Sequence, residues 1–213
     1  MKALRSLVCL FAVMLPLWSS FPLSRERPLG WFTMDRWTLD EGYIGKGTYS
    51  MFQDRTGYLW MGSENGLVRY DGRSFDLFNS QNVSQMRSND VIEVAQTSDG
   101  AIWAGTMDGL LCFRNGQVER FGLEHGLPHR DVGQLYIDRS GRFWLGLADG
   151  LAYMADGRIV PVELPGETGS AYVEDILEGP DGHPWVLTRT NILRIDGTTV
   201  TNMVLQEGQG RFN

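Results

Sequence analysis

A repeat of 41 to 43 residues constrains the fold of this chain more than any other feature of its sequence. The fullest copy runs from Asp54 to Leu67, and similar stretches begin at Thr97, Asp138 and Gly179. The period is read from the tryptophans at the same point of each copy, which are Trp60, Trp103, Trp144 and Trp185. A fixed period in this range is typical of repeat architectures, in which one structural unit packs against the next. The repeat therefore decides how every segment of the chain is interpreted.

Each copy divides into four short strands joined by turn residues. The second strand carries the tryptophan and ends at a pair that favours a two-residue hairpin, because glycine adopts positive φ without strain. These pairs are Asn65-Gly66, Asp108-Gly109 and Asp149-Gly150. In the fourth copy Asn191 replaces the glycine, and we expect the same left-handed backbone there because Asn tolerates it well. Four strands per unit predict an all-β fold, a β-propeller of four-stranded antiparallel blades with about four repeats present.

The repeat and the first residues of the chain suggest how it is divided. Residues 1–20 contain a charged start, an apolar run from Leu7 to Trp18 and small residues, which is the order of a secretory signal peptide. We therefore expect an exported protein, in the periplasm or otherwise outside the cytoplasm. Residues 21–30 are assigned to a linker and residues 31–213 to propeller blades, with repeats at about 47–78, 90–121, 131–162 and 172–203. Residues 31–37 match the end of a repeat and are predicted to be a stray outer strand.

Charge and cysteine content exclude some classes of function. The chain has a net charge of −7 and no basic run, which argues against nucleic acid as a partner. Its two cysteines are Cys9, inside the signal, and Cys112. Removal of the signal would leave a single cysteine, so we expect a domain without an internal disulfide bond that is held together by packing.

Residues suited to catalysis or metal binding are scarce. His125, His129 and His183 have no Glu or Cys at ligand spacing, and no serine lies in a Gly-x-Ser-x-Gly motif. The turn residues Asp54, Asp99, Asp138 and Asp181 lack the alternating acids of a calcium loop, which favours a role in turn formation. The sequence thus predicts a protein that is not an enzyme and needs neither a metal nor a cofactor.

The best candidates for ligand binding are positions that differ between repeats. The four tryptophans could form a sugar-binding platform, but equivalent residues in every copy more simply fill the space between adjacent sheets. We assign them and Gly66, Gly109 and Gly150 to the structure of the repeat. Polar residues stand ten positions before each tryptophan, and with a loop residue they form the candidate ligand-binding set Ser50, Glu93, Gln134, Asp175 and Arg130. The alternative for the inner-strand residues is a solvated channel lining.

The repeat resembles that of a known family. The pattern Asp-x-x-Gly-x-x-Trp-x-Gly-Thr-x-x-Gly-Leu is matched best at 54–67 and 97–110, well at 138–151 and poorly at 179–192, and Gly126-Leu-Pro-x-x-Asp-Val follows as an inter-blade phrase. This resembles the two-component regulator propeller repeat of the extracytoplasmic sensor region of hybrid histidine kinases and related bacterial receptors. The resemblance implies a ligand-sensing module for a small polar ligand, with a saccharide as the family analogy.

The resemblance also implies partners that this chain does not contain. Family members continue with further repeats, an immunoglobulin-like module, a membrane span and a transmitter, so the chain resembles the amino-terminal part of a receptor. An uncovered terminal blade would expose an apolar face, which predicts a homodimer through that blade. Two alternatives stay open. The stretch from Asp181 to Thr188 resembles a repeat of streptogramin lyase, an enzymatic propeller, and a propeller can also serve as a scaffold for partner proteins.

Overall fold

The computed structural model describes residues 36–38, 40, 42–165, 171–197 and 199–203. The predicted signal peptide 1–20, the linker 21–30 and all but the last two residues of the predicted strand 31–37 lie outside the described residues. Within residues 37–203 the strands form four antiparallel four-stranded sheets, each in chain order. No helix in the part of the chain that the structure describes is long and apolar enough to cross a membrane.

Each sheet is one blade, and the strands have the following bounds. Blade 1 comprises β1 (Thr48–Gln53), β2 (Leu59–Ser63), β3 (Gly66–Tyr70) and β4 (Phe75–Phe78). Blade 2 comprises β5 (Val91–Gln96), β6 (Ile102–Thr106), β7 (Gly109–Arg114) and β8 (Gln117–Phe121), and the short 3-10 helix η3 (Leu123–His125) follows it. Blade 3 comprises β9 (Val132–Ile137), β10 (Phe143–Leu147), β11 (Gly150–Ala155) and β12 (Arg158–Val162). Blade 4 comprises β13 (Val173–Glu178), β14 (Pro184–Thr188), β15 (Ile192–Asp196) and β16 (Thr199–Asn202).

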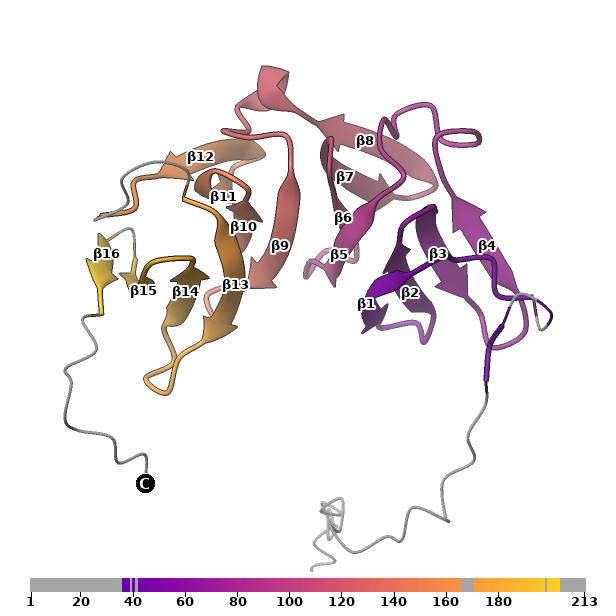
Figure 1. The fold of residues 1–213 in the computed structure, drawn as a ribbon, viewed down its shortest axis with the longest axis horizontal. Coiled ribbons are helices and arrows are strands. Elements are labelled where there is room, and N and C mark those ends of the chain that lie inside the picture. Colours follow the sequence, from indigo (N-terminus) through magenta and orange to yellow (C-terminus); the bar gives the residue numbers. More distant parts are fainter. Residues whose placement is uncertain (1–35, 39, 41, 166–170, 198, 204–213) are drawn as a thin grey trace, which may run out of the picture. The chain divides into compact units, whose positions relative to one another are not determined.

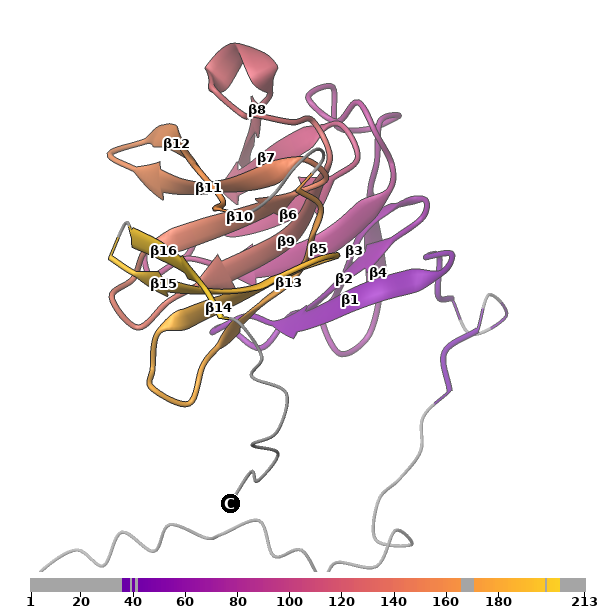
Figure 2. The same ribbon diagram turned by 60° about the vertical axis from the view of Figure 1, so that its left-hand side comes forward.

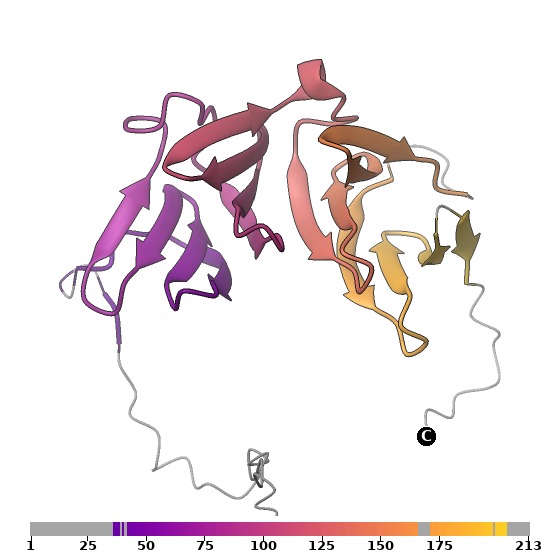
Figure 3. The same cartoon turned by 180° about the vertical axis from the view of Figure 1, so that it is seen from behind.

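The blades follow one another in chain order and meet along their first strands (Figures 1, 2 and 3). Strand β1 contacts β5, β5 contacts β9, and β9 contacts β13, so these four strands are the inner strands of the array. The prediction of an all-β propeller with four-stranded antiparallel blades is confirmed. We call the face of a blade toward the preceding blade its leading face, and the face toward the following blade its trailing face.

Apolar side chains fill the space between adjacent blades. Trp60 and Leu67 of blade 1 share a buried cluster with Val94 and Leu111 of blade 2. Trp103 and Trp144 occupy the same place on the trailing faces of blades 2 and 3, and all three tryptophans are buried. Trp185 of blade 4 has no following blade among the described residues and is only half-buried. The repeated tryptophan therefore lies where one sheet packs on the next.

An acidic residue fixes the tryptophan in two of the blades. The indole Nε1 of Trp60 donates to Asp54 Oδ2 at 2.8 Å, and that of Trp144 donates to Asp138 Oδ2 at 2.9 Å. The other carboxylate oxygen of Asp54 accepts from the backbone nitrogens of the following turn, at Thr56 and Tyr58. Burial alone would raise the pKa of Asp54, but these hydrogen bonds outweigh it and hold the pKa below its usual value. The acid of the repeat thus joins the turn to the packing residue.

The hairpin turns follow the predicted glycine chemistry in three of the four blades. Gly66, Gly109 and Gly150 have φ values of 145°, 112° and 109°. The expectation for Asn191 is wrong, because Asn191 is not among the described residues with positive φ. In this turn the backbone nitrogen of Thr188 donates to Asn191 O at 2.9 Å, and the hydroxyl of Thr188 accepts from Asn191 N at 3.0 Å. A hydroxyl at this position is shared with blades 1 and 2, where Ser63 and Thr106 donate to the glycine carbonyls of their turns.

A second glycine of the repeat sets how closely the blades approach. Gly62, Gly105 and Gly146 lie on the second strands, where the first valine of the next inner strand presses on them. A Cβ on Gly62 would lie 2.5 Å from Val91 O, and one on Gly105 would lie 2.6 Å from Val132 O. Leu187 occupies this position in blade 4 and is 37% exposed. Blade 4 therefore lacks the glycine at which each of the other blades packs closely against the next inner strand.

Candidate functional site

A β-bulge at the start of each inner strand places the predicted polar residues. In blade 1 the pairing of β1 with β2 shifts between Thr48 and Ser50, and in blade 2 the pairing of β5 with β6 shifts between Val91 and Glu93. Corresponding shifts precede Gln134 and Asp175 in blades 3 and 4. A bulge puts an extra residue into one strand and redirects the side chains beside it. The repeat thus brings four polar residues to equivalent positions on four neighbouring strands.

Three of these residues lie opposite the glycine of the second strand. Ser50 pairs with Gly62, Glu93 with Gly105, and Gln134 with Gly146. Side chains at paired positions point to the same side of a sheet, so the glycine leaves room beside the polar group. A Cβ on Gly62 would lie 2.8 Å from Ser50 Oγ, which is buried and has no hydrogen-bond partner among the described residues. These residues therefore lie at the inner edge of the blade junctions.

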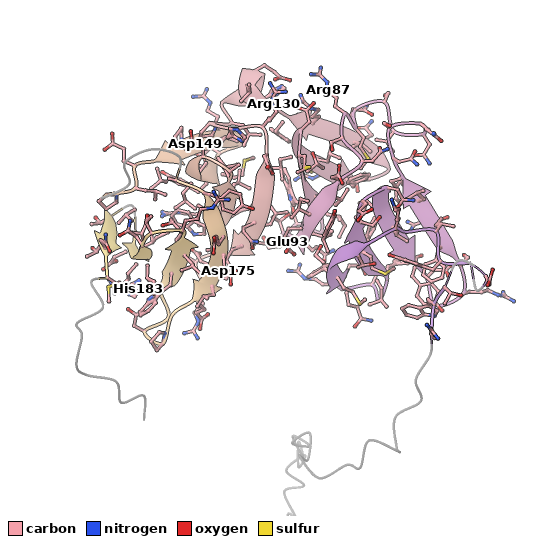
Figure 4. All side chains as sticks on the ribbon, viewed as in Figure 1. Arg87, Glu93, Arg130, Asp149, Asp175 and His183 are labelled. Carbon is pink, nitrogen blue, oxygen red and sulfur yellow. The ribbon has the colours of Figure 1, made fainter. Side chains whose placement is uncertain are left out.

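We call Ser50, Glu93, Gln134 and Asp175 the inner-strand row. Within it, Glu93 is the residue whose pKa is shifted by its surroundings. Its carboxyl group is half-buried between blades 2 and 3, and this burial raises the pKa of Glu93. A hydrogen bond from Val94 N at 3.2 Å acts in the opposite direction, and the charge of Asp175 raises the pKa further. Figure 4 shows Glu93 on β5 and Asp175 on β13, the inner strands on either side of β9. A poorly solvated carboxyl group is a ready hydrogen-bond partner for a polar ligand.

The other predicted residues differ in exposure and place. Gln134 is half-buried, whereas Asp175 is exposed and lies opposite Leu187 rather than a glycine. Arg130 is exposed in the loop before β9, and its carbonyl accepts from Gly109 N at 2.7 Å. Figure 4 shows Arg130 away from both Glu93 and Asp175. The structure therefore brings together the four inner-strand residues, while Arg130 belongs to a different end of the blades.

The histidines do not join this row. His125 Nδ1 accepts from Gly122 N at 3.1 Å, and His129 Nδ1 accepts from Asp131 N at 3.1 Å. His183 lies in the turn between β13 and β14, with its Nδ1 4.0 Å from Asp196 Oδ1, and Figure 4 places it away from Glu93. Across the described ranges no three His, Cys, Asp or Glu side chains gather in a group that could hold a metal ion. Asp54, Asp99, Asp138 and Asp181 all accept hydrogen bonds within their turns.

Asp131 is a candidate that the sequence analysis missed. It precedes the first valine of β9, is half-buried, and has a pKa raised by burial, although neighbouring His129 acts to lower it. The same position holds Asp90 in blade 2 and Gly47 in blade 1, so its place in the repeat was visible in the sequence. Its burial was not, because it depends on the packing of the preceding loop. Asp131 adds a second poorly solvated carboxyl group at the start of an inner strand.

Comparison with known proteins supports the repeat and the fold. Residues 42–65 match the family model of the two component regulator propeller, which confirms the predicted resemblance at the first repeat. A catalytically inactive virginiamycin B lyase from Staphylococcus aureus, solved with quinupristin, is similar in structure with a TM-score of 0.61 and 18% identity, over 77% of this chain and 57% of the lyase. No curated protein sequence matches this chain.

Two further solved structures share the fold. PorZ, a surface component of the type-IX secretion system of Porphyromonas gingivalis, has a TM-score of 0.60 and 15% identity over 82% of this chain and 30% of PorZ. The extracellular domain of a putative one component system from B. thetaiotaomicron has a TM-score of 0.51 and 17% identity over 76% of this chain and 28% of that domain. The chain spans less than two thirds of each of these structures. At these identities the likeness concerns the fold alone.

Proposed function

We propose that this chain is an exported sensory module of a signalling receptor, in which the inner strands bind a small polar ligand without chemical turnover. The propeller repeat at 42–65 and the fold shared with an extracellular receptor domain support the sensory role. The observation that carries the binding site is the half-buried carboxyl group of Glu93, at a bulge opposite Gly105. A polar side chain held in a niche at a blade junction can contact a ligand and the neighbouring blade together.

The ligand class that we propose is a saccharide or another small molecule rich in hydroxyl groups. Glu93 and Gln134 offer a carboxyl and an amide on neighbouring inner strands, which between them donate and accept hydrogen bonds, whereas the hydroxyl of Ser50 is buried beside Gly62. Signalling would then follow from a change in blade packing that downstream receptor modules detect. This part of the proposal rests on the position of the row at the junctions of blades 1, 2 and 3.

Calorimetric titration with a panel of neutral, acidic and amino sugars tests this function. We expect saturable binding of one class, weakened at least about tenfold by Glu93→Gln because a carboxyl contact is lost. Glu119→Gln is the matched control, since Glu119 is exposed on the outer strand β8. Binding that both variants lower equally would remove Glu93 from the site. If no sugar of the panel binds and Glu93→Gln changes stability alone, the inner-strand residues are a solvated channel lining and the proposed binding site is wrong.

The lyase alternative is distinguished by turnover. The virginiamycin B lyase shares the fold, but the stretch that suggested the lyase, Asp181 to Thr188, holds its histidine His183 away from Glu93. Incubation of the protein with quinupristin and a divalent cation, followed by mass spectrometry, should return the antibiotic unchanged. Formation of a product at a rate proportional to protein concentration would contradict the proposed role without turnover.

A further inference from the structure

A groove lies between the outer strands of blades 1 and 2. It has a volume of about 810 Å³, and it is lined by β3, β4 and the following loop on one side and by the start of β8 on the other. Binding sites for small molecules commonly measure about 300–1,000 Å³. The lining combines a charged pair, Arg69 and Asp76, with the apolar side chains of Phe78, Val83 and Val118. The groove thus has the size and the mixed lining of a small-molecule site.

Four contacts hold the guanidinium group of Arg69 at the wall of this groove. Arg69 pairs with Trp60 across β3 and β2, so its side chain shares the trailing face of blade 1 with the indole. Arg69 Nη2 donates to Asp76 Oδ2 at 2.7 Å. The guanidinium carbon lies 4.9 Å from the ring centroid of Tyr58, 5.7 Å from that of Trp60 and 5.8 Å from that of Phe78. Aromatic faces attract a cation, so the group is fixed before any ligand arrives.

The charged pair keeps one donor and one acceptor available. Among the described residues, neither Arg69 Nη1 nor Asp76 Oδ1 has a hydrogen-bond partner. The side chain of Arg69 is 34% exposed and that of Asp76 is 52% exposed, so a ligand in the groove can reach both. Since the two charges offset each other, the groove presents a donor beside an acceptor without a net charge from the pair.

The equivalent positions at the other described junctions do not hold such a pair. Cys112 occupies the place of Arg69 in blade 2, where it pairs with the tryptophan of that blade. In blade 3 the place of Arg69 is taken by Tyr153, and the place of Asp76 is taken by Val160. Both of these residues line the corresponding groove between blades 3 and 4. The charged pair is therefore a property of the groove between blades 1 and 2 and not of the repeat.

Blade 3 has the same cation–aromatic contact with a different outcome. Arg142 lies over the ring of Tyr153, 4.8 Å from its centroid, and its Nη1 donates to Gly197 O of blade 4. This arginine therefore spends its free nitrogen on the next blade. Arg69 is instead held on its own blade by Asp76, and its Nη1 stays available in the groove.

From these contacts we propose that the groove between blades 1 and 2 binds a neutral sugar unit, in which one hydroxyl accepts from Arg69 Nη1 and an adjacent hydroxyl donates to Asp76 Oδ1. Hydroxyl groups both donate and accept, as this pair requires. An anionic ligand would be repelled by Asp76 and a cationic ligand by Arg69, so a neutral polyol suits both groups. The C–H groups of the sugar would face the apolar side chains of Val83 and Val118. This site is separate from the inner-strand row and does not depend on it.

Calorimetric titration of the full chain with maltose, cellobiose and lactose tests the groove. We expect at least one of these neutral disaccharides to bind saturably. Arg69→Met should weaken the binding at least about tenfold, because it removes the donor and keeps an unbranched side chain over the rings. Asp76→Asn should also weaken it, because the carboxylate acceptor is lost. Arg73→Met is the matched control and should leave the affinity unchanged, since Arg73 is exposed in the turn between β3 and β4 and does not line the groove.

Gln117→Trp is a second variant, needed because Arg69 also packs on the aromatic core. Gln117 is exposed at the start of β8 and lines the groove, so an indole there should fill the space and abolish binding without removing a core contact. Tighter binding of glucuronate than of every disaccharide, no binding of any disaccharide, or an affinity that Arg69→Met and Gln117→Trp leave unchanged would overturn the proposal. Binding that Glu93→Gln abolishes and Arg69→Met preserves would also overturn it, and would leave the inner-strand row as the sugar site.

Discussion

At the scale of single residues, the partial burial of the Glu93 carboxyl group makes the stability of the fold depend on pH. Its pKa is raised in the folded protein, so the ionised form is less stable there than in the unfolded chain. The resulting penalty is absent well below the ordinary carboxyl value of 4.5 and appears as the pH rises through the raised pKa. A niche that serves packing alone would favour a neutral side chain. An ionised carboxyl group at this position therefore costs stability that a neutral side chain would not cost.

Glu93→Gln should therefore raise the melting temperature at neutral pH by removing an ionised group from a half-buried position. The gain should shrink as the pH falls and vanish well below pH 4.5, where Glu93 is protonated in both states. Thermal unfolding of both proteins between about pH 3 and 8 measures this difference. Glu119→Gln, on the exposed side of β8, provides the comparison. A melting temperature that falls at neutral pH would show that the ionised carboxyl group stabilises the fold.

The hydrogen bond between Asp138 and Trp144 supports the core at the level of one residue pair. Asp138→Ala should cost about 1–3 kcal/mol, because the fully buried indole loses the acceptor of its N–H and the turn loses its cap. Ser140→Ala removes only an exposed hydroxyl that donates to the same carboxylate, and should change stability by less than about 0.5 kcal/mol. Chemical denaturation of the two variants compares them. Similar losses would show that the carboxylate acts on the turn rather than on Trp144.

At the scale of elements, the glycine of the second strand decides how two blades stack. Gly105→Leu should destabilise the protein by about 1–3 kcal/mol or more, because its side chain would meet the backbone of Val132. Gly133→Ala is the matched control, since a Cβ there meets nothing within 4 Å and its φ is not positive. Denaturant unfolding gives both values. A harmless Gly105→Leu would mean that blades 2 and 3 can separate without cost.

Blade 4 departs from the repeat in several ways that should lower its local stability. Trp185 is half-buried, and its Nε1 has no hydrogen-bond partner among the described residues, since Gly179 stands where the other blades have Asp or Thr. Leu177 and Leu187 are exposed on the same blade. Hydrogen exchange should therefore be faster in β14 to β16 than in β6 to β7 or β10 to β11. Uniform protection across the four blades would contradict a weaker fourth blade.

At the scale of the whole molecule, the exposed apolar residues of blade 4 predict weak self-association. Leu177 and Leu187 lie on strands β13 and β14, with Trp185 between them in the sequence. We propose a homodimer through this blade, and expect it to be weak because Leu177 and Leu187 are the only exposed large apolar side chains among the described residues of the blade. Sedimentation velocity over a range of concentrations should show association that Leu187→Asp reduces. A chain that stays monomeric at high concentration would contradict the dimer.

The sequence by itself determined the four-blade organisation. The tryptophan period, the Asn65-Gly66 class of turns and the strand lengths depend on local backbone preferences, which adjacent residues express directly. It also placed Ser50, Glu93, Gln134 and Asp175 at one repeat position. The turn at Asn191 could not be read in this way, since a residue that tolerates positive φ does not have to adopt it.

Only the tertiary structure decided what those positions mean. The niche of Glu93 exists because Gly105 lets Val132 approach, and the burial of Asp131 and the exposure of Met51 depend on which sheet lies opposite. The sequence shows that Leu187 replaces a glycine. Only the structure shows that the equivalent glycines contact the next inner strand, whereas Leu187 is exposed. Residues of stacked sheets are buried by contact with the adjacent sheet. The sequence pattern of one repeat therefore does not predict which of its residues the neighbouring repeat covers.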